Sequence, residues 1–475
     1  MQDLEARAEK LRRQFERFGQ DHVFRFWGEL TADEKRRFLR QLEAIDLPLL
    51  DRLAEELVRN SASTAPQRGE LTPPEVIPVP RTPEQRARAE EARKAGEALL
   101  RAGKVGVLLV AGGQGTRLGF NGPKGKFPIT PVKKKTLFRH HAEKILALTR
   151  RYGRPIPWLI MTSEANDAET RAYFAEENNF GLPPGDVIFF QQDMIPAVDE
   201  SGKFFLERKD RVFTNPNGHG GTLLALRKSG ALDLLRARGI EELFYFQVDN
   251  VLIQICDPVF IGYHIRAGAD MSCKVVAKRD PYEKVGVIGY LNGRLTVIEY
   301  SDLTEEEMTA ANPDGSLRYN AGSIAIHMLR RAFVEELTEG EFSLPYHRAH
   351  KKIPHLDEHG RPVNPAAPNG YKFETFIFDA LQYARSAVIL EVERKKEFSP
   401  VKNAKGIDSP ATAQQDLVNY WAEWLEAAGV SVPRDRNGNV QGTLEISPLF
   451  ALDEEEFLRK VPAGLKFRDG LYLGG

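Results

Sequence analysis

Residues 108–129 read LLVAGGQGTRLGFNGPKGKFPI, and they hold four glycines between Gly112 and Gly119. One arginine and two lysines follow within the same stretch, ending at Lys126. The apolar run KVGVLLV at 104–110 leads into these glycines and predicts a β-strand. Glycines let backbone amides approach a ligand closely, and nearby cations favour an anion. The stretch therefore predicts a strand followed by a loop that binds phosphate groups.

Short apolar runs alternate with helical patterns on both sides of this stretch. The runs at 156–163, 186–192, 243–250 and 271–278 predict strands, and 82–101, 136–151, 166–178, a segment from about 221, and 411–427 predict helices. Such alternation is typical of a largely parallel sheet covered on both faces. Residues 285–300 differ, because two alternating runs flank Asn292-Gly293 and predict a β-hairpin.

The composition of the chain suggests three regions. Thr31 and Glu34 have the spacing of a capping box at the start of an N-terminal helix. A Pro-, Ser- and Thr-rich segment at 60–83 cannot hold a helix and reads as an extended connection. We therefore expect an N-terminal helical region with a Pro-rich linker at 1–95, a catalytic domain at 96–390 and a small C-terminal domain at 391–475.

The overall charge and the cysteines argue against a nucleic-acid-binding protein and against a zinc protein. With 475 residues, 42% of them hydrophobic, and a net charge of −1, the chain lacks the basic excess of nucleic-acid-binding proteins. Cys256 and Cys273 form no zinc motif, so both are expected to be buried free thiols. The charged N-terminus has no signal-peptide core, and no run is long enough to span a membrane. A cytoplasmic protein without nucleic-acid or membrane partners is expected, and its oligomeric state stays open.

Two common glycine-rich loops do not match this stretch. The dinucleotide fingerprint requires G-x-G-x-x-G, but the glycine after Gly113 and Gly115 comes four residues later, at Gly119. The Walker A loop requires Ser or Thr after Gly-Lys, but Phe127 follows Gly125-Lys126. A glycine-rich turn with solvated lysines is the plain alternative.

The pattern GGxGTRLGxxxPK resembles the nucleotide-binding loop of the eukaryotic-type UDP-sugar pyrophosphorylases, and most closely the UDP-N-acetylglucosamine enzymes. The resemblance covers nearly the whole chain, through FFQQDMIPAV, NPNGHGG, QVDN, VIEYSDL, NAGSIA, KKIPHLDEHG, PNGYKFETFIFD and EFSPVKNA in family order. It implies an α/β fold with a Rossmann-like, GT-A-like nucleotidyltransferase core built on a mixed sheet. It also implies uridylyl transfer from UTP to a hexose 1-phosphate, with Mg²⁺ as cofactor and pyrophosphate as the second product.

The resemblance also implies roles for particular residues. Arg117, Lys124 and Lys402 are the predicted catalytic cations. The predicted nucleotide contacts are Ala111, Gly112, Gly113, Gly115, Lys124, Gln192, Gly218, Asp249 and Lys372, and the predicted sugar contacts are His219, Glu299, Asn320 and Lys402. Asp249 also follows an apolar run, as ligand-binding carboxylates of α/β proteins do, and is the predicted ligand of Mg²⁺. A helix cap is the alternative role for this carboxylate.

His219 departs from the acetylglucosamine pattern. The acetylglucosamine enzymes typically have Asn there, in GNGG, whereas the UDP-glucose and broad-specificity enzymes have GHG. We favour N-acetylglucosamine 1-phosphate as substrate because most motifs follow that pattern, with glucose 1-phosphate or several sugars as the alternative. A nicotinamide-dependent dehydrogenase and an inactive binding protein are rivals from other classes.

Overall fold

The computed structural model describes residues 2–60, 69–340 and 344–474 of the chain. It forms two compact units, each assembled from three segments of the chain. The smaller unit takes 1–69, 192–221 and 344–377, and the larger unit takes 70–191, 222–343 and 378–475. Of the connection predicted at 60–83, residues 61–68 lie outside the described part. The domain boundaries expected at 95 and 390 stay a prediction.

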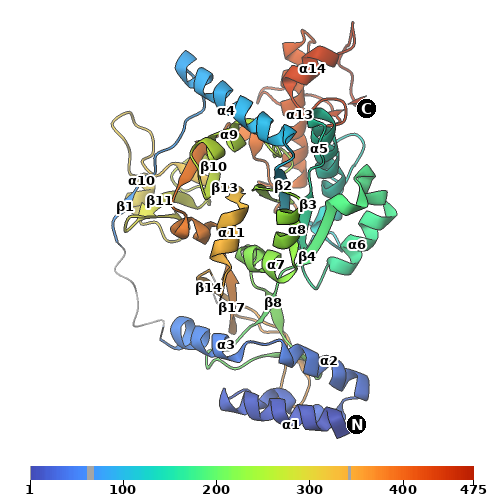
Figure 1. Cartoon of the computed structure of the whole chain (residues 1–475), viewed down its shortest axis with the longest axis vertical. Helices are drawn as coiled ribbons and strands as arrows, with labels where there is room; N and C mark the ends of the chain where they lie inside the picture. The colour runs from blue at the N-terminus through green and yellow to red at the C-terminus, as the bar shows by residue number, and fades with distance from the viewer. Residues whose placement is uncertain (1, 61–68, 341–343, 475) are drawn as a thin grey trace. The chain divides into compact units, whose positions relative to one another are not determined.

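Ten strands among the described residues form one sheet in the larger unit (Figure 1). They are β1 (Leu71–Thr72), β2 (Val105–Val110), β3 (Trp158–Thr162), β4 (Val187–Gln191), β9 (Glu242–Gln247), β10 (Met271–Ala277), β11 (Val287–Leu291), β12 (Arg294–Ile298), β13 (Ala321–Arg330) and β18 (Ala387–Glu391). The main path of pairing runs β1-β11-β13-β9-β2-β3-β4, while β10 pairs with β13 and β18, and β12 pairs with β11.

The sheet is mixed, as the family resemblance implies, and less parallel than the alternation of runs suggests. β4, β3, β2 and β9 are parallel, whereas β13 runs antiparallel to both β9 and β10. Alternation of apolar runs and helices does not reveal strand direction, so β13 could not be oriented from the sequence. The fold class predicted for the core is confirmed.

Alternate residues of each strand point to opposite faces of the sheet, and helices cover both faces (Figure 1). The larger unit contains α4 (Pro83–Arg101), α5 (Leu137–Tyr152), α6 (Asp167–Glu176), α7 (Thr222–Lys228), α8 (Ala231–Ala237), α9 (Pro258–Arg266), α10 (Glu305–Thr309), α11 (Arg331–Leu337), α12 (Arg394–Glu397), α13 (Pro410–Ala427) and α14 (Glu454–Lys460). Val107 and Val105 of β2 face the core that includes α5 and α13, whereas Gly106 faces Leu235 of α8.

Local sequence signals decide where several elements begin and turn. Thr82 accepts a hydrogen bond from the Gln85 amide at 3.2 Å, and the Gln85 side chain accepts one from the Thr82 amide, so a capping box starts α4. The predicted hairpin joins β11 to β12, with Asn292 and Gly293 at φ values of 52° and 75°. Both positive angles are those that a two-residue hairpin turn requires.

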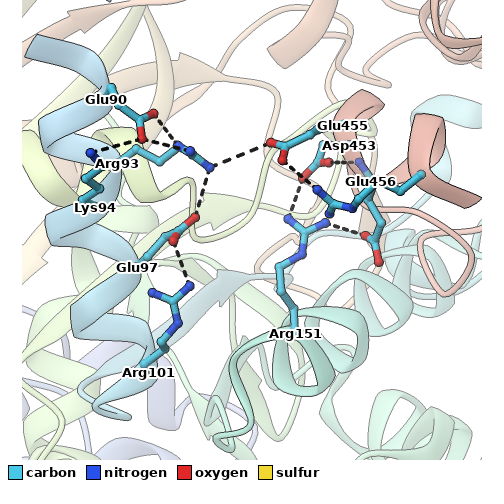
Figure 2. Close-up of polar contacts among 10 residues, drawn as sticks. Glu90, Arg93, Lys94, Glu97, Arg101, Arg151, Asp453, Glu455 and Glu456 are labelled. Atoms are coloured by element: carbon cyan, nitrogen blue, oxygen red, sulfur yellow. Dashed lines mark hydrogen bonds and ion pairs between the residues drawn. The ribbon is translucent and has the colours of Figure 1, made fainter. Parts of the chain in front are cut away.

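The last part of the larger unit packs α13 and α14 near a short parallel pair, β19 (Leu444–Ile446) and β20 (Leu471–Leu473). Figure 2 shows the ion pairs that link α14 and the residue before it to two other helices. Arg151 of α5 donates to Asp453 at 2.5 Å and also to Glu456, and Arg93 of α4 lies 3.8 Å from Glu455.

The smaller unit combines helices with short strands. Its elements are α1 (Gln2–Arg17), α2 (Ala32–Glu43), α3 (Leu47–Ala54), β5 (Met194–Pro196), β6 (Leu206–Arg208), β7 (Arg211–Val212), β8 (Thr214–Pro216), β14 (Tyr346–Lys351), β15 (His355–Leu356), β16 (Pro362–Val363) and β17 (Gly370–Thr375). Phe38, Leu39 and Leu42 recur at helical spacing on α2 and are buried in one core with Val198 and Phe373.

Cys256 and Cys273 are both buried and form no disulfide, as expected. In the described ranges, the structure contains no helix with the length and apolar character needed to cross a bilayer.

Candidate active site

The larger unit places its predicted site residues at one edge of the sheet. β2 and β9 are parallel with Val110 opposite Gln247, so the glycine loop and the segment holding Asp249 leave the sheet side by side. β13 is antiparallel to β9, so its first residues lie at this same edge. The carboxyl ends of parallel strands are where α/β proteins bind ligands. We call this region the sheet-edge site.

The glycine loop folds back on itself between β2 and α5. The Gly115 amide donates to Gly122 O at 2.9 Å, and the Lys124 amide donates to Gly113 O at 3.1 Å. A Cβ at Gly115 would lie 2.8 Å from the Phe120 ring, so this glycine is required by close packing. Gly113 differs, because a Cβ there would meet open space and the backbone is exposed to an incoming ligand. Arg117 is also exposed, in the 3-10 turn Thr116–Leu118.

Two residues that the sequence analysis did not single out hold this loop in place. The Asn166 side chain donates to Ala111 O at 2.9 Å and to Gly113 O at 3.2 Å, and Ser163 donates to Gly112 O at 2.8 Å. Asn166 is 1% exposed and Ser163 is fully buried. Both follow β3 in the segment TSEAND, where two polar residues after an apolar strand were the available signal.

Lys124 and Asp249 meet directly. Lys124 Nζ donates to Asp249 Oδ2 at 2.8 Å, and their side chains are 17% and 11% exposed. Burial raises the pKa of the Asp249 carboxyl, but the charges of Lys124 and Lys402 outweigh burial, so its pKa lies below the ordinary value. Asp249 is therefore a carboxylate at neutral pH with two cations close to it.

The segment before Lys402 is bonded to the backbone around Asp249. The Val401 amide donates to Asp249 O at 3.0 Å, and the Lys402 amide donates to Asp408 O at 2.7 Å. The predicted phosphate-binding lysine therefore adjoins the predicted metal ligand. These two residues are separated by more than 150 positions of sequence, and their proximity comes from the fold.

Two side chains of α5 contact backbone carbonyl oxygens close to Asp249. His141 Nε2 lies 3.0 Å from Val248 O, and Lys144 Nζ donates to Val251 O at 2.8 Å. Burial lowers the pKa of Lys144 to about 7 and that of His141 to about 3. A neutral His141 at physiological pH acts here as a hydrogen-bonding support.

Glu299 and Asn320 lie at the same edge, as strand register requires. Val287 of β11 is opposite both Ile298 and Gly322, so the residue that follows β12 and those that precede β13 lie on either side of the start of β11. Asn320 Oδ1 accepts from the Lys278 amide at 2.7 Å, which fixes the orientation of its side chain. The structure thus places the two predicted sugar contacts of the larger unit at one edge of the sheet, with β11 between their strands.

The other predicted site residues, Gln192, Gly218, His219 and Lys372, belong to the smaller unit. Gln192 is 8% exposed and directly follows β4 in the chain. Gly218 has a φ of 87°, and a Cβ there would lie 2.3 Å from Thr375 O. Close backbone packing against β17 therefore explains this glycine.

His219 is held by packing and by a backbone amide. The Ile377 amide donates to its Nδ1 at 3.2 Å, and its ring centroid lies 5.3 Å from that of Phe376. Burial, with a smaller effect of His347, lowers the pKa of His219 to about 4. The imidazole is therefore neutral at physiological pH.

Lys372 lies on β17 with its Nζ 5.0 Å from the centre of the Phe213 ring. Burial lowers the pKa of Lys372 more than Glu374 raises it. An anion bound at Lys372 would favour its protonated form and so raise the pKa that burial lowers.

A protein family described as UTP–glucose-1-phosphate uridylyltransferase matches residues 54–420. The chain belongs to this family. The human UDP-N-acetylhexosamine pyrophosphorylase-like protein 1 is 39% identical, over 98% of this chain and 97% of its own. The UDP-N-acetylglucosamine pyrophosphorylase of Saccharomyces cerevisiae is 38% identical, over 87% and 90% of the two chains. The recognition made from the motifs is confirmed.

A solved structure shares the fold along nearly the whole chain. The uridine diphosphate N-acetylglucosamine pyrophosphorylase of Trypanosoma brucei, in complex with inhibitor, superposes with a TM-score of 0.82. It is 28% identical, and the match covers 99% of this chain and 98% of that one. With the family match, this makes the chain a nucleotidyltransferase of the UDP-sugar pyrophosphorylase family.

The donor groups of the sheet-edge site are of the kind that could hold a magnesium ion together with phosphate oxygens of a substrate. Mg²⁺ prefers oxygen ligands, keeps several waters, and is often bound by one or two carboxylates with phosphate oxygens. Asp249 offers a charged carboxylate with one oxygen bonded to Lys124. Within the described ranges, no group of three or more His, Cys, Asp or Glu residues could hold a metal alone. Asp249 could contribute one oxygen ligand to an ion that takes its other ligands from phosphate and water.

Proposed function

We propose that the chain makes UDP-N-acetylglucosamine and pyrophosphate from UTP and N-acetylglucosamine 1-phosphate. The observation that carries the proposal is the meeting of Lys124, Asp249 and the segment of Lys402 beside the glycine loop at one sheet edge. The names of the human and yeast relatives favour an acetylated hexosamine as the sugar.

The reaction is a substitution at the α-phosphorus of UTP by a phosphate oxygen of the sugar 1-phosphate. Because the attacking group is already an anion, neither a protein nucleophile nor a general base is required. The main barriers are repulsion between two anions and their alignment, so cations and fixed amides are the useful groups. In this scheme Lys124 and Arg117 neutralise the triphosphate, and Lys402 holds the phosphate of the sugar.

Asp249 would hold Mg²⁺ in this scheme. The ion, when bound, supplies positive charge to the phosphate oxygens. Asp249 contributes an oxygen ligand whose ionised state Lys124 and Lys402 favour. Glu299 and Asn320 are the proposed sugar contacts, and a cytoplasmic location is proposed for the protein.

The second candidate sugar is glucose 1-phosphate, and His219 is the observation that favours it. An imidazole presents fewer hydrogen-bonding groups than an Asn amide to an acetamido carbonyl. The ring is neutral, so it would contribute shape and one hydrogen bond in place of charge.

The test is pyrophosphate release by purified protein with UTP and Mg²⁺, comparing the two sugar 1-phosphates at equal concentration. Preference for the acetylated sugar supports the proposal. Preference for glucose 1-phosphate would replace it with the second candidate. Binding of UDP-sugar without pyrophosphate release from any sugar would make the chain a binding protein.

A further inference from the structure

A cluster of three ionisable side chains, two of them buried, lies behind the sheet-edge site. Lys274, in the middle of β10, is fully buried, and its Nζ lies 2.8 Å from Asp257 Oδ2 and 2.8 Å from Glu397 Oε1. Glu397 is 2% exposed. Removing such charges from water is costly, and apolar residues of similar volume often give equal or greater stability. Stability alone is therefore a weak explanation for the cluster.

The two acidic members of this cluster anchor different parts of the chain. Asp257 precedes α9, and its Oδ1 caps that helix by accepting from the Val259 amide at 2.9 Å. Glu397 is the last residue of α12, in the segment that leads to Lys402. Lys274 thus joins two chain segments to one central strand.

These same two segments are bonded to one another up to the site. Glu397 Oε1 accepts from the Gln254 amide at 3.2 Å, and Glu397 O accepts from Asn250 Nδ2 at 2.8 Å. Asn250 Oδ1 in turn accepts from the Ser399 amide at 3.0 Å. Next along the chain, the Val401 amide donates to Asp249 O. These hydrogen bonds form an unbroken series. It begins at the cluster and ends at the backbone of Asp249 and of Val401, the residue before Lys402.

We infer that Lys274 and Glu397 are positioning residues that fix the spacing between Asp249 and Lys402. The inference deepens the proposed function and rests on it for its kinetic consequences. Asp249 would hold the metal on the nucleotide side and Lys402 the sugar phosphate, so their spacing sets the alignment of the two reacting anions. A misplacement of about 1 Å far from the chemistry can lower a rate about 100-fold.

Glu397→Gln tests the inference, because the amide keeps the shape of the side chain and replaces the carboxyl group that contacts Lys274. We expect kcat/KM for the sugar 1-phosphate to fall about 10- to 100-fold, with a change of about twofold or less in KM for UTP. The Mg²⁺ concentration needed for the half-maximal rate should also rise. Equal losses toward both substrates, in proportion to a loss of melting temperature, would overturn the positioning role.

Two further variants separate positioning from stability. Asp257→Asn keeps a capping side chain for α9 and leaves the Lys274–Glu397 contact, so its kinetic effect should be smaller than that of Glu397→Gln. Lys104→Met removes an exposed lysine that pairs with Glu241 at 2.7 Å, and is the matched control. It should leave both kinetic constants unchanged. If Asp257→Asn impairs sugar use as strongly as Glu397→Gln, the specific link through Glu397 is wrong.

Hydrogen–deuterium exchange gives a readout that does not require turnover. In Glu397→Gln, the amides of 249–254 and 396–402 should exchange faster, while those of β2 and β3 keep their wild-type rates. Unchanged exchange in the two segments would overturn the inference even if activity fell. If the wild-type protein released no pyrophosphate, the proposed function would fail, and exchange would still decide whether Glu397 fixes these segments.

Discussion

At the scale of single residues, loss of the Lys124 side chain should lower turnover strongly and change the free energy of unfolding little. Lys124→Ala removes a cation from the sheet-edge site, but Lys402 remains near Asp249. We expect turnover to fall about 100- to 1,000-fold, comparable to the loss of one charge-stabilising donor in other enzymes. The free energy of unfolding should change by about 1 kcal/mol. Pyrophosphate release and urea denaturation measure the two effects.

Lys126→Ala is the control from the same loop. Lys126 Nζ pairs with Glu169 at 2.6 Å and lies over the Tyr173 ring, so it is occupied by other contacts. Its loss should leave turnover within about twofold of wild type. Parallel losses of activity and stability in Lys124→Ala would argue against a phosphate-binding role.

His219→Asn tests whether this position reads the sugar. Asn supplies both a donor and an acceptor, so the ratio of N-acetylglucosamine to glucose 1-phosphate use should rise several-fold, about 1 kcal/mol. Because the pKa of His219 is about 4, the wild-type ratio should stay constant between pH 6 and 8. Competition assays measure both. His359→Asn, at an exposed position of the smaller unit, is the control, and equal ratios in all three proteins would remove His219 from the specificity argument.

Sequence motifs predicted the residues of the sheet-edge site. They did not predict the buried residues whose hydrogen bonds fix the backbone around that site. Lys124, Asp249 and Lys402 lie in recognisable motifs, and the fold brings them to one place. Asn166 lies outside the quoted motifs, and Glu397 is the first residue of EFSPVKNA without any sign there that it is buried, because a buried Asn or Glu looks like a surface residue in a single sequence. Their importance appears only through partners distant in the chain, such as Gly113 O and Lys274 Nζ.

At the scale of elements, the attachment of α14 depends on ion pairs that should respond to pH (Figure 2). Burial raises the pKa of Glu456, but hydrogen bonds from Lys460, the Leu452 amide and Arg151 outweigh it and lower the pKa to about 2. The ordinary pKa of this carboxyl is 4.5. Its contribution to stability is therefore complete above pH 4.5 and is lost as the pH falls toward 2.

Arg151→Met should lower the free energy of unfolding by about 1–2 kcal/mol at pH 7. The difference from wild type should shrink as the pH falls below 4.5, because Glu456 then gains a proton in the unfolded chain, while in the folded wild-type protein its pKa is about 2. Urea denaturation at pH 7 and pH 3.5 measures this, with Arg150→Met on the exposed face of α5 as control. A difference that stays constant over this range would contradict the role of Glu456.

Helix starts could be predicted because their signals are local, whereas helix contacts could not. Thr31 and Thr82 mark the starts of α2 and α4 through side chains within four residues. The packing of α4 on α9 depends on Gly96 and Gly262 instead. A Cβ at Gly262 would lie 1.7 Å from Ala92 O, and one at Gly96 would lie 2.0 Å from Pro258 O. Such close approach has no signature in a single sequence, where each glycine looks like a helix weakener.

At the scale of the whole molecule, the order of elements was predictable, whereas the interleaving of segments in the two compact units has no local sequence signal. The smaller unit joins segments that are distant in the chain, as where Val198 pairs with Tyr371 and Asn215 Nδ2 donates to Phe373 O at 3.3 Å. A reading along the chain divides it at linkers and so gives consecutive regions. Each unit here contains segments that are separated in the chain by residues of the other unit. The spacing of motifs along the sequence does not show which segments pack together.

Ligand-dependent stability of the whole chain distinguishes the proposed function from the dehydrogenase alternative. A ligand that binds only the folded state at 100 times its Kd adds about 2.7 kcal/mol to the free energy of unfolding. UTP with Mg²⁺ should therefore raise the melting temperature of the wild-type protein, and should raise that of Lys124→Ala less, because a phosphate-binding cation is gone. NAD should produce no shift, since Gly113, Gly115 and Gly119 lack the spacing that places a dinucleotide pyrophosphate on a helix N-terminus. An equal shift with NAD and UTP would show that the glycine loop accepts a dinucleotide, and the nucleotide specificity proposed here would be wrong.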